Sequence, residues 1–223
     1  GKNQMPVTRM ATAALIREQL YKAERYLDEV EKARAEEDVD SPEYDIKCEA
    51  LLPLLRGEIQ AHIHCHRADD IFTAIRLAEE FQLDYVIVHG TEGHLIAEEL
   101  ADKNARVLNG PILCDRSKPE LRNLTPSCPG KLRAAGVQTA LITDHPVIPL
   151  QYLTLCAGLA VREGMSREDA LRAITIEPAR ICGIDNRVGS LAVGKDADLV
   201  VFRQDPLSLA AKPEKVFVSG QEI

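Results

Sequence analysis

The chain has 223 residues, of which 45% are hydrophobic and 28% are charged, and its formal net charge is −8. This composition is too apolar for a disordered chain, and an acidic balance without a basic stripe argues against nucleic acid as a main partner. No segment approaches the ~18–20 apolar residues of a membrane span, and no secretory signal opens the sequence, so we expect a cytoplasmic protein with no membrane partner. The six cysteines form no Cys-x-x-Cys pair and are expected to be mostly reduced core thiols.

The first 57 residues are predicted to be helical. A loop over residues 1–9 enters a helix that Thr8 caps, and apolar residues then recur every three or four positions from Ala13 to Val30. This spacing predicts an amphipathic helix of roughly 25 residues. An acidic turn at 36–42 ends it, and a second short helix is expected at about 44–55.

From residue 58 onward the sequence alternates between short apolar runs and helical patterns, which predicts a parallel sheet built from right-handed crossovers. The predicted strands are 58–66, 84–89, 106–113 and 138–143, and the predicted helices are 68–81, 93–103, 131–135, 148–163 and 167–174, the last capped by Ser166. Short segments with glycine turns at 189–202 and 215–220 predict a small β region instead of another strand–helix unit.

Three histidines alternate with apolar residues along the first of these strands. Because side chains two apart in a strand share a face, His62, His64 and His66 are predicted to lie on one face, with Cys65 in the packing behind them. Neutral imidazole is a common metal ligand, so the stretch suits a metal or proton-transfer site. A polar strand edge that happens to be rich in histidine is the alternative.

Two later strands favour the metal interpretation. The strand at 84–89 ends in His89, and the strand at 138–143 is followed by Asp144 and His145. In parallel α/β proteins, catalytic groups gather at the carboxyl ends of the strands. Histidines and an aspartate on successive strand ends form the constellation of a metal-dependent hydrolase.

The number of strand–helix units leaves two interpretations of the architecture. We count four, whereas a closed (β/α)₈ barrel needs eight and typically ~250 residues. The chain is therefore either an open, doubly wound sheet of four strands or the second half of a larger protein.

Several motifs carry a family resemblance. They are Ile63-His-Cys-His-Arg-Ala-Asp-Asp-Ile71, Val88-His-Gly-Thr-Glu92, Thr143-Asp-His-Pro146, Ala173-Ile-Thr-Ile-Glu-Pro-Ala179 with Gly183, and the glycine-punctuated tail from Val188 to Val201. With these, the sequence resembles the metal-dependent amidohydrolase superfamily, and within it the imidazolonepropionase-like and prolidase-like enzymes, over about residues 57–223.

This resemblance implies an α/β fold: the second half of a (β/α)₈ TIM-type barrel with a carboxyl-terminal β-sandwich segment. Residues 1–57 would lead into the barrel, 58–185 would form four βα units, and 186–223 would be part of the small β-sandwich. His64, His89 and Asp144 would correspond to the metal-binding residues of the fifth, sixth and eighth barrel strands. The family's His-x-His pair on the first strand and its lysine or glutamate on the fourth have no counterpart, so the resemblance implies an incomplete chain.

The resemblance also implies a function. The complete enzyme would hydrolyse a carbon–nitrogen bond of a small molecule, in an amide, cyclic amide or amidine, using one or two divalent ions, with zinc expected. His64, His89 and Asp144 would bind metal, and Asp144 would also serve as catalytic base and then acid. His66, Arg67 and His145 are candidates for substrate binding. His66 could instead pair with a carboxylate, Arg67 with Asp69 or Asp70, and His145 could point the other way.

The partner that the resemblance implies is the missing amino-terminal half of the barrel, or a second chain that supplies it, and a homo-oligomer is a further expectation. The alternative function is a non-catalytic metal-binding or structural remnant, since the first-strand histidines are absent. A doubly wound ligand-binding domain is a third interpretation, but the glycine-rich phosphate loop typical of such domains is missing.

Overall fold

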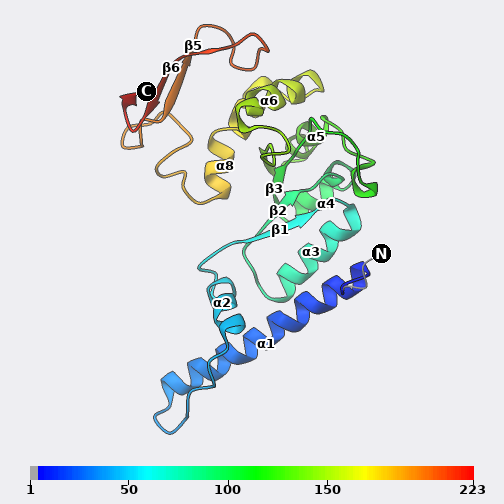
Figure 1. The fold of residues 1–223 in the computed structure, drawn as a ribbon, viewed down its shortest axis with the longest axis vertical. Helices are drawn as coiled ribbons and strands as arrows, with labels where there is room; N and C mark the ends of the chain where they lie inside the picture. Colours follow the sequence, from blue (N-terminus) through cyan, green and yellow to red (C-terminus); the bar gives the residue numbers. More distant parts are fainter. Residues whose placement is uncertain (1–4) are drawn as a thin grey trace. The chain divides into compact units, whose positions relative to one another are not determined.

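The computed structural model describes residues 5–223, so residues 1–4 of the expected entry loop lie outside the described part (Figure 1). The chain divides into two compact units. One unit contains the residues up to Ile63 together with Phe72–Tyr85, and the other contains His64–Ile71 together with Val86–Ile223. The three residues expected to bind metal, His64, His89 and Asp144, all belong to the second unit.

Two helices form most of the first unit. Helix α1 spans Arg9–Ala35, and the Thr8 hydroxyl accepts a hydrogen bond of 3.1 Å from the Ala11 amide, as the predicted cap requires. Helix α2 spans Ile46–Leu55 and begins two residues later than predicted, because the Asp45 carboxylate caps it. The two helices pack through one small cluster of buried side chains, Ala23, Tyr26, Cys48 and Leu52.

The central sheet has four strands in the order β1-β2-β3-β4, and β3 pairs in parallel with both β2 and β4. The strands are β1 (Ala61–Cys65), β2 (Tyr85–His89), β3 (Arg106–Asn109) and β4 (Gln138–Leu141). The predicted parallel α/β architecture is confirmed, although the strands are shorter than expected. Strand β3 ends at Asn109, because Gly110 has a φ of 150° and Pro111 has no amide hydrogen for a ladder bond.

Helices connect and follow these strands. They are α3 (Ala68–Glu80), α4 (Ala97–Asp102), α5 (Cys128–Ala134), α6 (Leu153–Arg162), α7 (Arg167–Ala173) and α8 (Ile176–Ile181), with 3-10 turns at Gly93–Leu95, Pro119–Leu121 and Leu150–Tyr152. Ser166 caps α7 as predicted, accepting from the Asp169 amide at 3.0 Å. The helices predicted at 93–103 and 148–163 each begin with a 3-10 turn, and α8 was not predicted.

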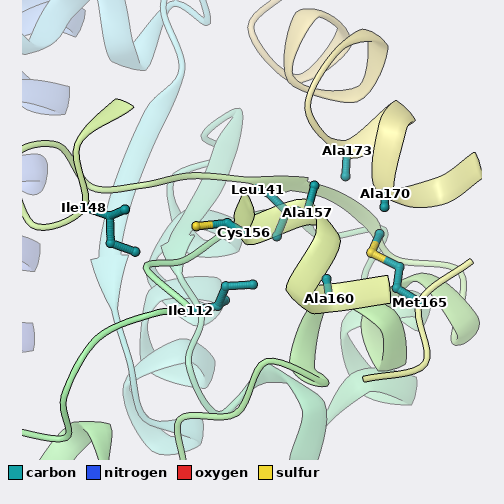
Figure 2. Packing of buried hydrophobic residues seen from close by; sticks show 9 residues of the cluster. All are labelled: Ile112, Leu141, Ile148, Cys156, Ala157, Ala160, Met165, Ala170 and Ala173. Carbon is teal, nitrogen blue, oxygen red and sulfur yellow. The ribbon is translucent and has the colours of Figure 1, made fainter. Parts of the chain in front are cut away.

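A core of small side chains holds α6 and α7 in the second unit (Figure 2). Ala157 and Ala160 on α6 and Ala170 and Ala173 on α7 are fully buried. Alanine lets helices approach closely, and larger side chains fill the remaining space around them: Ile112, Leu141, Ile148, Cys156 and Met165. Because Ile148 belongs to this core, the core holds the segment after β4 in place.

The cysteines follow the prediction. All six are free thiols, and four of them are buried: Cys48, Cys65, Cys128 and Cys156. Cys65 lies in the packing behind its strand, and burial raises the pKa of its thiol to about 12. A thiol with such a pKa stays protonated and behaves as a small apolar side chain.

The carboxyl-terminal residues form the small β region that the sequence predicts. Strands β5 (Leu199–Phe202), β6 (Pro213–Val218) and β7 (Gln221–Glu222) make an antiparallel sheet in that order. Several of its apolar side chains are exposed, among them Val200, Val201 and Val218. Among the helices of the described residues, none has the length and apolar character needed to cross a membrane.

Candidate metal centre

Three imidazoles converge at the carboxyl ends of β1 and β2. His64 lies on β1, His66 directly follows it, and His89 ends β2. One ring nitrogen from each histidine lies within 4.8 Å of those of the other two. His66 and His89 are buried, at 7% and 3% exposure, whereas His64 is exposed. Within the described residues these three side chains are the group that could hold a metal ion.

The His89 ring is fixed by a hydrogen bond on the side away from the cluster. Its Nδ1 lies 2.7 Å from the carbonyl oxygen of Gly110, so Nδ1 carries the proton and donates it. In this tautomer Nε2 is the acceptor nitrogen, and it lies 3.0 Å from His64 Nδ1. A metal-binding histidine almost always donates its other ring hydrogen to a carbonyl or carboxylate. His89 already has this arrangement.

His66 has a similar anchor. Its Nδ1 lies 2.8 Å from the Thr91 hydroxyl, and its ring stacks on that of His89 with centroids 4.6 Å apart and an angle of 21°. The His64 ring meets both of the other rings edge-on, at centroid distances of 4.9 Å and 4.3 Å. The three rings thus form one packed cluster with little freedom to reorient.

The surroundings of His66 and His64 favour the neutral form of these two rings. Burial and, to a smaller extent, the neighbouring rings of His89 and His64 together lower the pKa of His66 to about 4. Burial, followed by the effect of His89, also lowers the pKa of His64, while the Asp144 carboxylate acts in the opposite direction. Neutral imidazole is the form that binds a metal, so burial prepares both side chains for that role.

A tight turn after β2 connects the histidine-bearing segments. The Gly90 amide donates to the Cys65 carbonyl at 2.9 Å, and the Glu92 amide donates to the His66 carbonyl at 2.8 Å. The buried Glu92 carboxylate accepts from the Ala68 amide at 2.9 Å and from Asn123 Nδ2 at 2.8 Å. Glu92 therefore binds the start of α3 and the long loop after β3 to the cluster.

The structure separates Asp144 from this cluster. Asp144 follows β4, is exposed, has a φ of 53°, and does not belong to the group of close ligand atoms among the described residues. Its charge nevertheless raises the pKa of His64, so the carboxylate lies close enough to act on that ring. His66 thus occupies the third position near His64 and His89 that the sequence analysis assigned to Asp144.

The remaining predicted residues have other surroundings. The Arg67 guanidinium binds both carboxylate oxygens of Asp69, at 2.8 Å and 3.0 Å, which is the salt-bridge alternative of the sequence analysis. His145 and His62 are exposed, and neither belongs to the cluster. Only part of the predicted histidine face therefore contributes to the site.

Sequence reasoning did not single out three residues that support the cluster: Thr91, Glu92 and Asn109. All three are buried, at 7%, 6% and 2% exposure. Thr91 and Glu92 lie within one of the family motifs, which by itself assigns them no role. Asn109 carried a signal that could have been used, since it is a polar residue at the end of an apolar strand, directly before Gly-Pro.

The residues present fit a divalent metal ion. Imidazole nitrogens bind zinc and related ions at ~2.0–2.1 Å, which in a tetrahedral site places two nitrogens about 3.3 Å apart. His64 Nδ1 and His89 Nε2 are 3.0 Å apart, so a small separation of the two rings would suffice. His89 Nε2 is available once the mutual hydrogen bond opens, and His64 Nδ1 is available once its hydrogen moves to the other ring nitrogen.

Known proteins are similar to this chain over all or part of its length. The Thermotoga maritima amidohydrolase crystal structure superposes with a TM-score of 0.95 at 44% identity, covering 100% of this chain and 58% of that one. Amidohydrolase tasK of Hapsidospora irregularis is 31% identical over 180 residues, which are 79% of this chain and 18% of that protein. The imidazolonepropionase of Brucella suis is 40% identical over 73 residues, or 31% of this chain and 18% of that enzyme.

The chain therefore spans well under two thirds of the length of each of these relatives. The amidohydrolase family model matches residues 26–223, which include both strand ends with histidines, Asp144 and the β tail. The family resemblance of the motifs is confirmed by this match, and the chain belongs to the amidohydrolase family.

Proposed function

We propose that this chain is the carboxyl-terminal half of a metal-dependent hydrolase that cleaves a carbon–nitrogen bond of an amide, cyclic amide or amidine in a small molecule. The observation that carries the proposal is the packed cluster of His64, His66 and His89, whose ligand nitrogens lie within 4.8 Å of one another. Membership of the amidohydrolase family supplies the chemistry to which such a cluster is suited.

In this proposal His64 and His89 hold one divalent ion, with zinc expected, and the complete enzyme binds one or two ions. His66 is the third imidazole donor that the geometry offers, while its assignment to substrate binding is the alternative. A bound ion at such a site supplies a water molecule whose pKa is lowered towards ~7 and polarises a carbonyl oxygen. The chain's own residues direct these histidines at one point and favour the neutral form of His64 and His66.

Asp144 is proposed as a metal ligand that also moves the proton. An exposed carboxylate beside the cluster can take a proton from the attacking water and deliver it to the leaving nitrogen, acting as base and then as acid. His145, next to it, is retained as a candidate for substrate contact. Arg67 would serve in substrate binding only by giving up its bidentate pair with Asp69.

The proposal requires an amino-terminal half from the same protein or from a second chain. That half would supply the first-strand His-x-His and the fourth-strand ligand and would close a TIM-type barrel over residues 58–185. Residues 1–57 would lead into the barrel, and 186–223 would form part of the small β-sandwich, which would cover the exposed valines of β5 and β6. We place the enzyme in the cytoplasm, and association into homo-oligomers is part of the proposal.

Metal content and intact mass, measured on one purified sample, test the proposal. We expect about one or two zinc ions per assembly, together with a companion segment that the mass spectrum identifies. The variant His89→Ala should lose the metal, whereas His62→Ala, an exposed histidine outside the cluster, should keep it. A folded protein that binds no zinc, or that binds it equally well in the His89 variant, would instead support a non-catalytic remnant.

A further inference from the structure

The end of strand β2 has an unusual backbone that something in the structure must stabilise. His89 and Gly90 both lie in the left-handed region, with φ values of 73° and 52°. For a residue with a side chain this conformation is unfavourable, and it persists where neighbours hold it. A side chain at position 90 would approach Val107 Cγ1 to 3.0 Å, so glycine is needed there. His89 alone carries the conformational cost within the turn.

Asn109 contacts this turn from the neighbouring strand. It is the register partner of His89 in the parallel pair of β2 and β3, and it is 2% exposed. Its side-chain Nδ2 donates to the His89 carbonyl at 2.7 Å. The same nitrogen lies 3.4 Å from the Gly90 carbonyl and 3.4 Å from Cys128 Sγ. The amide thus directs its hydrogens at the backbone of both left-handed residues.

The other atom of the amide shows that this orientation has a cost. Asn109 Oδ1 is buried and has no hydrogen-bond partner among the described residues. A buried acceptor without a partner is unfavourable, because it has lost its hydrogen bonds to water. Rotating the amide by half a turn would place this oxygen against the His89 carbonyl, and two acceptors at that distance repel each other. The unpaired oxygen is therefore the consequence of directing the donors at the turn.

The residue after Asn109 holds the His89 side chain itself. The Gly110 carbonyl accepts the Nδ1 hydrogen of His89 at 2.7 Å. The Asn109 carbonyl is in turn anchored by the Ile142 amide at 3.0 Å. Two consecutive residues at the end of β3 therefore fix the backbone of His89 through a side-chain amide and its ring through a carbonyl.

We propose that Asn109 is a positioning residue of the metal centre, whose side-chain amide holds the His89–Gly90 turn left-handed and so directs the His89 Nε2 at His64 and His66. The inference rests on the proposed function for its consequence, which is the metal affinity of the cluster. Removing an outer-shell partner of a metal ligand typically lowers metal affinity about 10–100-fold.

The test compares two variants of the protein as isolated, with any companion segment present. Asn109→Leu keeps most of the volume and removes the donors. The control is Thr139→Val, because Thr139 is also fully buried and its hydroxyl donates to the Val137 carbonyl at 3.0 Å, on strand β4. Zinc affinity is measured by chelator competition, and the geometry of the site by the visible spectrum of the cobalt-substituted protein.

We expect Asn109→Leu to weaken zinc binding about 10–100-fold and to alter the cobalt spectrum, with less than about a threefold change for Thr139→Val. Wild-type affinity and an unchanged spectrum in the Asn109 variant would overturn the inference. An equal loss in both variants would also overturn it, because the effect would then come from general destabilisation.

If the Asn109 variant does not fold, a measurement on the unsubstituted protein can still show whether the Asn109 amide holds the turn. Nitrogen-15 spectra should show slow solvent exchange of the Asn109 amide hydrogens and a hydrogen on Nδ1 of the His89 ring. Rapid exchange of that amide would overturn the inference. If the wild-type protein binds no zinc, the proposed function fails, and these same spectra still decide whether Asn109 holds the turn.

Discussion

Two strand ends in this molecule share a left-handed backbone but differ in their surroundings. His89 at the end of β2 and Asp144 after β4 both have a left-handed backbone, with φ values of 73° and 53°. His89 is 3% exposed and hydrogen-bonded through its ring to Gly110, whereas Asp144 is exposed. Both residues were predicted to bind metal, but only His89 belongs to the packed imidazole cluster of the described residues.

The position of each strand in the sheet explains the difference. Strand β2 lies between β1 and β3, and those neighbours supply His64 on one side and Asn109 with Gly110 on the other. Strand β4 is the last strand in the order, so it has β3 on one side only within the described sheet. Residues at the end of an interior strand are held by the neighbouring strands on both sides. Residues at the end of an edge strand have a neighbour on one side only, so their surroundings depend on what pairs with the other side.

Substituting Asp144 gives the largest expected effect, because this residue is proposed to move the proton as well as to bind metal. Asp144→Asn should lower kcat about 10²–10⁴-fold, because an amide cannot take and return a proton. Stability should stay within about 0.5 kcal/mol, since the residue is exposed and asparagine tolerates a left-handed backbone. Steady-state kinetics, a thermal melt and metal analysis of one preparation check this. Full activity in the variant would remove Asp144 from the mechanism.

Substituting Gly110 tests how firmly the interior end is held. Gly110 has a φ of 150°, and a side chain there would collide with the Ile142 carbonyl oxygen. We expect Gly110→Ala to lower the free energy of unfolding by about 2–5 kcal/mol, through backbone strain and overpacking together. Denaturant unfolding measures this loss.

Gly136 provides the matched control for that substitution. It has a φ of 93°, and a Cβ added there would have no atom within 4 Å, so Gly136→Ala should cost only the strain of about 1–2 kcal/mol. Equal losses in the two variants would mean that the junction of β3 and β4 is more compliant than its geometry indicates.

Zinc addition tests whether the interior cluster alone supports binding. A ligand that binds only the folded state at 100 times its Kd stabilises that state by about 2.7 kcal/mol. For a chain of this size we expect a rise in Tm of roughly 5–10 °C. The rise should vanish in His89→Ala and be smaller but still measurable in Asp144→Asn, because the imidazoles remain in the second variant. A rise that disappears equally in both variants would make the aspartate as important for metal binding as His89 and would contradict the comparison of the two strand ends.

Local patterns in the sequence predicted the elements well. Short apolar runs, alternating with histidines in the first case, located the four strands, and the caps at Thr8 and Ser166 are where side-chain chemistry predicts them. The same patterns could not give strand lengths. Strand β3 ends at Asn109, at a glycine turn and a proline within what reads as one apolar run.

The site was only partly predictable, for a physical reason. His64 and His89 were recognisable because each lies at the end of an apolar run. The partners of these residues depend on which atoms two neighbouring strands bring together, and no periodicity encodes that. Thr91 beside His66 and Asn109 beside His89 are contacts of this kind. The choice of His66 over Asp144 as the nearest third group likewise follows from the strand order.

The smallest expected effect concerns Thr91 and decides the role of His66. Thr91 is 7% exposed, and its hydroxyl lies 2.8 Å from His66 Nδ1. Thr91→Val keeps the shape and removes that partner, so we expect a stability loss of about 1 kcal/mol and zinc affinity roughly tenfold lower. Thr91→Ser retains the hydroxyl and should keep the zinc affinity of the wild type.

The two proposed roles of His66 predict different results for Thr91→Val. If His66 is a metal donor, its loosened ring weakens zinc binding, and chelator competition detects the change. If His66 contacts only substrate, zinc affinity stays at the wild-type value while KM rises. A variant with unchanged zinc affinity and unchanged KM would exclude both roles, and the buried pair of His66 and Thr91 would then serve only to pack the interior strand end.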